Sequence, residues 1–274
     1  MNRVGEHPVT AGPLAPRWLA WSLESPRAGV TSVARVSLEN AGTATWRSRG
    51  ANGVRASFHW LDPLGNPIVW DGPRTALPHI VAPGEQVELE LAVTAPRPPG
   101  AYRLAFDLVE EHRFWFAEVG ATPLEIPVDV APRIAERTLA VRIHGATDPA
   151  TTAALAVQEE PVVEDEADAV AVAHLVSGAI PPPGWSRILL DAHVEGWAAV
   201  GTAVIPGARG RELDPWRGGG GRNPRFGHPL LLPSLLDGVE PTELLGLPAY
   251  AGPDGLFDGR AAVTLPRRSG RRPT

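Results

Sequence analysis

Cysteine and lysine are both absent from this chain of 274 residues, and methionine occurs once. Without cysteine there is no disulfide, no thiolate nucleophile and no cysteine-ligated zinc. All 25 basic residues are therefore arginines, which we interpret as a coding bias before a functional choice. No apolar run approaches the roughly 20 residues that a membrane helix needs. The first residues also lack the apolar core of a signal peptide, so we expect no membrane span and a cytoplasmic location.

The composition is that of a globular protein built from short elements. Hydrophobic residues make up 43% and charged residues 20% of the chain, which excludes extended disorder. Thirty prolines and 29 glycines predict many turns. The net charge of −6 argues against a nucleic-acid partner, because such a protein needs a surplus of basic groups.

The pattern along the chain predicts two domains, an all-β immunoglobulin-like sandwich followed by a small α/β module with a Gly/Pro-rich irregular C-terminal region. The expected divisions are a flexible N-terminus at 1–15, the sandwich at 16–130, a linker at 131–137, the α/β module at 138–266 and a basic flexible tail at 267–274.

Short runs of alternating apolar and polar residues fill the first half, separated by turn signals, as in a β-sandwich. The predicted strands lie at 30–40, 54–62, 67–71, 86–95, 101–111 and 113–119. The sequence LDPLGNP at 61–67 places Asp, Pro and Gly as a hairpin turn requires.

The second half changes period and predicts the order β-α-β-α-β, which is typical of a parallel sheet covered by helices. The expected strands are 138–145, 169–176 and 197–206, and the expected helices are 147–158 and 184–196. One late strand candidate lies at 260–266.

The first half resembles the tryptophan-rich immunoglobulin-like domains typified by the four-tryptophan module of selective-autophagy receptors, which also occur in bacteria. In that pattern a strand ends in Asn-x-Gly-Thr-x-x-Trp, a Pro-Gly-Glu hairpin follows, and a later Pro-x-x-Pro-Gly-x-Tyr forms a corner. The matching residues here are Asn40, Gly42, Thr43, Trp46, Pro83, Gly84, Glu85, Pro96, Pro99, Gly100 and Tyr102. The resemblance implies a fold that binds, spaces or decorates.

The second half resembles the core of an A-fold glycosyltransferase. The carrying residues are LVSGAIPPPGWSRILLDAH at 175–193 and WAAVGTAVIP at 197–206. In that family two aspartates just before the Pro-Gly-Trp turn hold the divalent ion that neutralises a diphosphate leaving group. Aligned on Pro181, these acids fall on Val176 and Gly178, whose side chains cannot coordinate a cation. The resemblance implies the shell of such an enzyme without its metal site.

Two sets of residues are candidates for ligand binding. The glycine run RGGGGRNPRFGHP at 217–229 offers Arg222, Asn223 and Arg225, which fit either a flexible loop or a loop that cradles a phosphate or a sugar hydroxyl. Trp70 and Trp115 fit either core packing or a surface groove that stacks on sugar rings. Trp46 and Trp60 are expected in the core.

No catalytic residue is assigned, because a G-x-S-x-G nucleophile elbow is missing, and we expect no cofactor and no metal. The leading hypothesis is a non-catalytic binding or accessory protein of bacterial glycan or cell-envelope polysaccharide assembly. Its partner would be a glycan, a nucleotide-sugar enzyme or its own copy. Two alternatives stay open: a metal-independent glycosyltransferase using a nucleotide-sugar donor, in which Arg222 or Arg225 offsets charge, and a structural protein–protein interaction module.

Overall fold

The chain folds as two compact units, Met1–Ala131 and Pro132–Thr274, in a computed structural model. The structure describes residues 1–5, 7–9, 11–144, 146–176, 181, 183–196, 199–201, 204–205, 249–250, 257–258 and 262–266.

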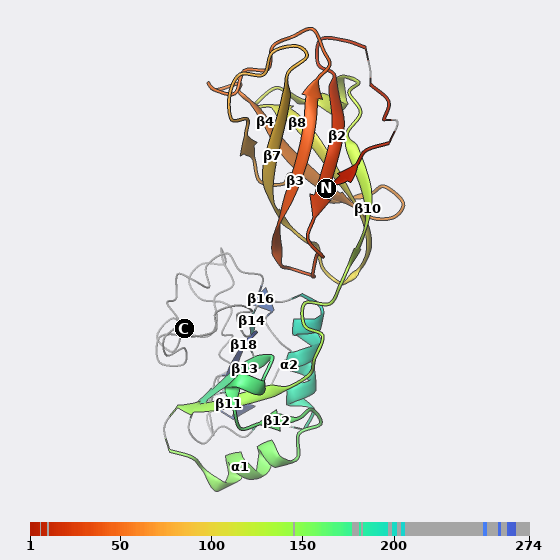
Figure 1. Cartoon of the computed structure of the whole chain (residues 1–274). Helices are drawn as coiled ribbons and strands as arrows, with labels where there is room; N and C mark the ends of the chain where they lie inside the picture. The colour runs from red at the N-terminus through yellow and green to blue at the C-terminus, as the bar shows by residue number, and fades with distance from the viewer. Residues whose placement is uncertain are drawn as a thin grey trace. The chain divides into compact units, whose positions relative to one another are not determined.

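The first unit is an all-β sandwich of two antiparallel sheets, as the alternating runs predict (Figure 1). One sheet has the order β1 (Asn2–Arg3), β2 (Pro16–Leu23), β3 (Thr31–Asn40) and β7 (Gln86–Thr94). The other has the order β10 (Leu124–Val130), β8 (Gly100–Glu110), β4 (Val54–Leu61) and β5 (Pro67–Val69), with β6 (Thr75–Ala76) paired to β4 and β9 (Phe114–Trp115) paired to β8.

One hydrophobic core lies between the two sheets. Along β7 every second residue is buried, so the strand places its apolar face on the core and its polar face in water. Trp46 and Trp60 are fully buried in this core, which confirms their predicted role. Trp18 joins them at 2% exposure.

The structure corrects the predicted strand at 113–119. Only Phe114–Trp115 is a strand, and the chain then turns into the 3₁₀ helix η1 (Phe116–Val119). Glu118 caps this turn by accepting the Trp115 N–H at 2.9 Å. The strands β2 and β10 were not delimited from the sequence. In β10 buried and exposed residues alternate over the whole strand, and Pro127 occupies one of the exposed positions, where it is tolerated because β10 is an edge strand.

The motif residues of the sandwich hold two loops together. The side chain of Asn40 donates to the carbonyls of Ala44 and Val81 at 2.9 and 3.1 Å, and it accepts the Gly42 N–H at 3.1 Å. The Tyr102 hydroxyl donates to the Pro98 carbonyl at 2.7 Å. Because these groups are side chains that satisfy backbone atoms, they define the loop conformations.

The second unit contains the predicted order of strands and helices. Its elements are β11 (Leu139–His144), α1 (Pro149–Ala156), β12 (Val162–Val163), η2 (Glu166–Asp168), β13 (Ala171–Val176), α2 (Trp185–Val194), β14 (Ala199–Gly201), β15 (Val204–Ile205), β16 (Ala249–Tyr250), β17 (Phe257–Asp258) and β18 (Ala262–Pro266). One sheet has the order β12-β11-β13-β18-β14-β16, and β15 pairs with β17.

This sheet is mixed, whereas the sequence predicted a parallel one. The strands β11 and β13 are parallel neighbours, but β18 lies antiparallel between β13 and β14. The strand β18, which is the late strand candidate at 260–266, thus separates β13 from β14. The predicted strand at 197–206 is divided into β14 and β15, which belong to different sheets.

Both helices begin where capping residues allow. The Asp148 carboxylate accepts the Ala150 N–H at 2.7 Å, and Pro149 begins α1. Gly184 precedes α2 with φ of 77°, a conformation that favours glycine. The helix predicted at 184–196 is α2, in which Trp185, Leu189 and Ala192 are buried.

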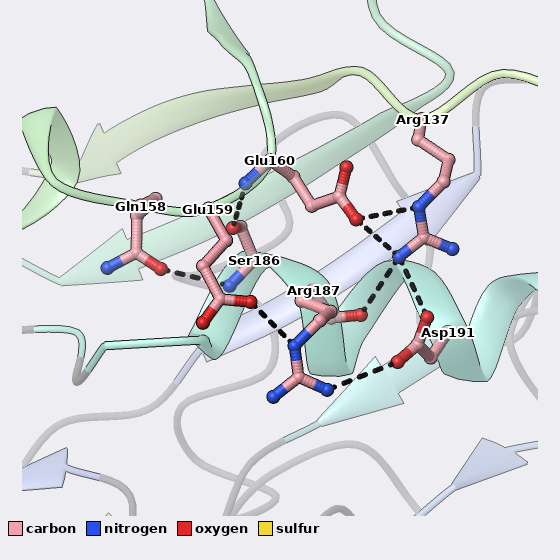
Figure 2. A network of polar contacts seen from close by, with 7 residues as sticks. All are labelled: Arg137, Gln158, Glu159, Glu160, Ser186, Arg187 and Asp191. Carbon is pink, nitrogen blue, oxygen red and sulfur yellow. Dashed lines mark hydrogen bonds and ion pairs between the residues drawn. The ribbon is translucent and has the colours of Figure 1, made fainter.

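A polar network attaches α2 to the chain segments beside it (Figure 2). Arg137 donates to Glu160 at 2.7 Å and to Asp191 of α2 at 2.7 Å. Arg187 of α2 donates to Glu159 at 2.6 Å. The three carboxylates neutralise the two guanidinium groups, so we interpret the network as structural.

Replacing Arg137 with alanine is expected to lower the stability of the second unit by about 1–2 kcal/mol, because its partly buried guanidinium pairs with two carboxylates. Hydrogen exchange of the α2 amides measures this change. Arg35→Ala, which removes an exposed pair on the sandwich, is the control and should leave the exchange of the sandwich amides nearly unchanged, because exposed ion pairs contribute little to stability. Equal effects of the two substitutions would contradict the prediction.

Candidate functional site

The two tryptophans proposed from the sequence as ligand-binding residues lie together in the structure. Trp70 follows β5 and Trp115 belongs to β9, and their ring centroids are 6.3 Å apart. Trp70 is 49% exposed, whereas Trp115 is 8% exposed. Trp70 therefore exposes part of its indole to solvent, whereas Trp115 is buried and contacts Trp70 from the protein side.

His59 of β4 joins the two tryptophans. Its ring stacks on Trp70 with centroids 4.2 Å apart and planes at 22°, and it meets the edge of Trp115 at 4.3 Å. The Arg74 guanidinium lies over the Trp115 ring at 4.6 Å. We call these four residues, His59, Trp70, Arg74 and Trp115, the aromatic platform. The histidine covers one face of the Trp70 indole, so the solvent-exposed part of Trp70 is packed against the protein on its other side.

The platform lies on the sheet that contains β4 and β8, on the face that is turned away from the sandwich core. Phe58 and Trp60 of β4 belong to that core, so the alternation of the strand places Ser57 and His59 on the opposite face. Both are nevertheless buried, at 0% and 4% exposure. The segments 70–74 and 114–119, which we call the cover, bury them.

One half of the cover approaches β4 closely because of a glycine. The Gly72 N–H donates to the Phe58 carbonyl at 3.1 Å, and a Cβ atom at Gly72 would lie 2.7 Å from the Phe58 oxygen. The Ser57 hydroxyl donates to the Gly72 carbonyl at 2.8 Å. Only glycine fits at this distance, so Gly72 determines where Trp70 lies.

The other half of the cover is attached to Asp107 of β8, directly opposite Ser57. Its carboxylate accepts the Leu108 N–H at 2.7 Å and the Ala117 N–H of η1 at 3.2 Å. Asp107 is completely buried. Burial raises the pKa of Asp107 to about 7, although the two N–H donors act in the opposite direction.

His59 is held in one tautomer by the cover. Its Nδ1 atom bonds to the Trp70 carbonyl oxygen, and because that oxygen only accepts, Nδ1 carries the proton. Burial lowers the pKa of His59, so the ring is neutral at pH 7. Its Nε2 atom is then a bare acceptor, buried without a hydrogen-bond partner.

Arg74 uses its donors within the protein. It bonds to Glu111 at 3.0 Å, to Asp71 at 2.6 Å and to the Gly72 carbonyl at 3.0 Å. The same guanidinium reaches the Ser57 hydroxyl at 3.3 Å. These contacts hold the planar group against Trp115, where it supports the platform.

Ser57, His59 and Asp107 are the residue types of a hydrolytic triad, but their contacts differ from those of a triad. The Ser57 hydroxyl bonds to Gly72 and Arg74, and His59 Nδ1 bonds to the Trp70 carbonyl. A triad requires the histidine to contact both the serine and the aspartate. The arrangement is therefore suited to presenting a surface and carries no activated nucleophile among these residues.

The other predicted site residues belong to the second unit. Val176 ends β13 and pairs in register with His144 of β11. Gly178, Arg222, Asn223 and Arg225 lie outside the described residues. Across the part of the chain that the structure describes, no three histidine or acidic side chains gather as a metal site would require. Within that same part, none of the helices has the length and apolar character to cross a membrane.

Sequence reasoning missed His59, Arg74 and Asp107. A histidine and a serine two apart in the run VRASFHWLD lie on one face of the strand, which is a weak signal because such a face is normally solvated. Nothing in the local pattern shows that the cover buries it.

Comparisons with known proteins assign no family. No protein-family model matches the chain and no curated protein matches it. The C-terminal domain of wzt is similar to it at 11% identity and a TM-score of 0.31, over 42% of this chain and 72% of that one. The CARDB domain of a Pyrococcus furiosus protein is similar at 15% identity and a TM-score of 0.25, over 42% of this chain and 94% of that one. A family 123 glycoside hydrolase from Clostridium perfringens is similar at 10% identity and a TM-score of 0.22, over 70% of this chain and 34% of that one. Scores this low carry no argument about function.

Proposed function

We propose that this chain is a non-catalytic binding or accessory protein of bacterial glycan or cell-envelope assembly, and that the aromatic platform contacts the glycan. One observation carries the proposal: Trp70 is half-exposed, yet its ring is stacked on buried His59 and supported by Trp115. A side chain that is already held in place loses little conformational entropy when a ligand binds.

A saccharide suits this surface in two ways. The C–H face of a pyranose ring is apolar and flat enough to lie on an indole, which gains dispersion and hydrophobic contact. The rim of the platform carries Asp71 and Glu118, both of which have solvent-accessible carboxylates, and these accept hydrogen bonds from sugar hydroxyls. A flat apolar surface with a few polar groups at its rim is the usual composition of a ligand site.

We further propose that the sandwich is immunoglobulin-like. Its sheets have the orders β1-β2-β3-β7 and β10-β8-β4-β5. Apart from the short β1, these correspond to the two sheets of such domains, with β5 as an added edge strand beside β4. Domains of this architecture serve mainly as scaffolds for binding surfaces. The proposal therefore agrees with a binding role for the exposed tryptophan next to β5.

For the second unit we propose a glycosyltransferase-like shell without catalysis. The order β11, α1, β13, α2 and the glycine cap of α2 support this interpretation. Val176 ends β13 in the position where the family resemblance places a metal-binding acid, and its side chain has no donor atom for a cation. In this proposal the second unit is a scaffold that docks the sandwich to an assembly enzyme.

Trp70→Ala is expected to weaken glycan binding about tenfold or more, since losing an aromatic contact of about 1.5 kcal/mol corresponds to that ratio. A glycan array identifies the saccharide bound by the full chain, and calorimetry then compares the variant. Ile80→Ala is the control, because Ile80 is 57% exposed but does not belong to the platform.

Three outcomes would overturn the proposal. The first is a wild-type chain that binds no saccharide on the array. The second is equal loss of binding in the two variants. The third is turnover of a nucleotide sugar in calorimetry with a donor panel, which would establish the metal-independent transferase instead.

A further inference from the structure

The charges around the aromatic platform are mostly negative. Asp71 follows Trp70 directly, Glu118 bonds to the Trp115 N–H, and Glu111 pairs with Arg74. Arg74, which pairs with Asp71 and Glu111, is the one guanidinium of the platform. The neighbouring Arg113 forms its own pair with Glu110 at 2.5 Å and is neutralised by it. The field at the platform therefore attracts cations.

The one cation of the platform is not available to an anionic ligand. Arg74 bonds to two carboxylates, a carbonyl and a hydroxyl, and its plane lies on Trp115. A sugar carboxylate or phosphate would have to displace Asp71 or Glu111 to reach it. Such an exchange yields no new ion pair overall, so uronic acids and sugar phosphates gain nothing here.

Acceptors, in contrast, remain accessible beside the exposed indole. The Asp71 side chain is 67% exposed, and Glu118 is exposed while using one carboxylate oxygen for the Trp115 N–H. An ammonium group bears only donors, so it can bond to these oxygens. A cation near the face of a tryptophan is also attracted by the ring itself.

His59 lies below the indole as an uncharged ring. It is neutral at pH 7 because burial lowers its pKa, and its Nε2 atom has no hydrogen-bond partner. A protonated histidine would repel an ammonium group, whereas the neutral ring does not. The His59 ring stacked on Trp70 therefore adds no positive charge beside the indole.

We propose that the aromatic platform selects a saccharide with a free ammonium group, that is, an amino sugar whose nitrogen is not acetylated. The sugar ring lies on Trp70, and its ammonium group bonds to Asp71 and Glu118. This inference rests on the proposed glycan-binding function and specifies its ligand class.

Three tetrasaccharides with the same linkage and different substituents on carbon two test the inference by calorimetry on the full chain. They are a chitosan tetrasaccharide with ammonium groups, a chitin tetrasaccharide with acetamido groups, and cellotetraose with hydroxyl groups. The chitosan form should bind about fivefold more tightly than the other two, which is the effect of one exposed ion pair or cation–π contact. The preference should diminish in high salt.

Asp71→Asn and Glu118→Gln are the informative variants. An amide at position 118 still accepts the Trp115 N–H, and Arg74 keeps Glu111 when Asp71 is changed. Each variant should reduce the ratio of chitosan to cellotetraose affinity to about twofold or less, since one charge is lost. Glu88→Gln, on the exposed face of β7, is the matched control and should leave the ratio unchanged.

The outcomes separate the inference from the function on which it rests. Equal binding of the three tetrasaccharides overturns the inference and supports the glycan-binding function. Tighter binding of an oligogalacturonate, which carries carboxylates, overturns the inference as well. Absence of binding to all of these ligands, together with an empty glycan array, overturns both.

Discussion

Replacing Asp107 with asparagine is expected to remove the largest pH dependence in the stability of the sandwich. Folded Asp107 keeps its proton up to about pH 7, because burial raises the pKa from its ordinary 3.8. The unfolded chain releases that proton near pH 4. Between these values the folded state binds one more proton, so the free energy of unfolding decreases as pH rises and levels off above about pH 7.

The decrease has an upper limit of about 4 kcal/mol, since the pKa moves by about three units at 1.36 kcal/mol each. Asparagine has no proton to lose, so its profile lacks this slope. The asparagine side chain has an amide nitrogen in place of one carboxyl oxygen. This nitrogen cannot accept the hydrogen bond of the Leu108 or Ala117 N–H that it faces. We therefore expect Asp107→Asn to be less stable than wild type by about 1–3 kcal/mol at pH 4.5, with the difference shrinking or reversing at pH 8.5.

Native-state hydrogen exchange of the β4 and β8 amides measures the free energy of unfolding of the sandwich alone. His59→Gln is the control. Burial lowers the pKa of His59 in the folded wild type, so the wild type loses stability as pH falls below 6.5. The His59→Gln variant should remove this loss at acid pH and keep the dependence of stability on pH that Asp107 causes. Parallel profiles for wild type and Asp107→Asn would contradict the prediction.

Replacing Asn40 with alanine is expected to lower the stability of the sandwich by about 2–3 kcal/mol. Asn40 is fully buried and satisfies the Ala44 carbonyl, the Val81 carbonyl and the Gly42 N–H. The Val81 oxygen keeps the Trp46 N–H at 2.9 Å as a second donor. The cost therefore comes mainly from Ala44 and Gly42, which are left without their partner.

Asn40→Asp should be more harmful than Asn40→Ala, because a carboxylate cannot donate and would face two carbonyl oxygens in a buried site. The matched control is Asn66→Ala. Asn66 is exposed and its side chain bonds to Asp62 at 2.8 Å, so its loss should cost about 0.5 kcal/mol or less. Equal effects at positions 40 and 66 in urea unfolding would contradict this prediction.

The elements that the sequence predicts well are those whose signals are local. The strand β7 alternates over its whole length, and α2 follows a glycine cap and places Trp185 and Leu189 on one buried face. The capping aspartate and proline of α1 are adjacent in the chain. Periodicity and capping depend on neighbours a few residues away, so they can be read without knowledge of the fold.

The errors arise where specific tertiary or capping contacts decide the structure and the local pattern does not. The run at 113–119 looks like a strand, but it becomes a 3₁₀ turn because Asp107 and Glu118 bond to its backbone. The mixed sheet of the second unit results from β18, which enters between two strands that the local pattern predicts as parallel neighbours. In the first case the partners lie 3 and 10 residues away, and in the second the partner strand lies far along the chain, but both outweigh local propensity.

The sequence by itself determined that the chain has a β-sandwich followed by alternating strands and helices, that Trp46 and Trp60 lie in the core, and that Trp70 and Trp115 are candidates for a surface site. Only the tertiary structure decided that Trp70 is exposed and Trp115 is buried beneath it. The pairing of β4 with β8 and the close approach of Gly72 to β4 bring His59, Asp107 and Arg74 to the same place. Alternation specifies which side chains share a face of one strand, but which segments cover that face depends on the pairing of β4 with β8 and on the close backbone contact of Gly72 with Phe58.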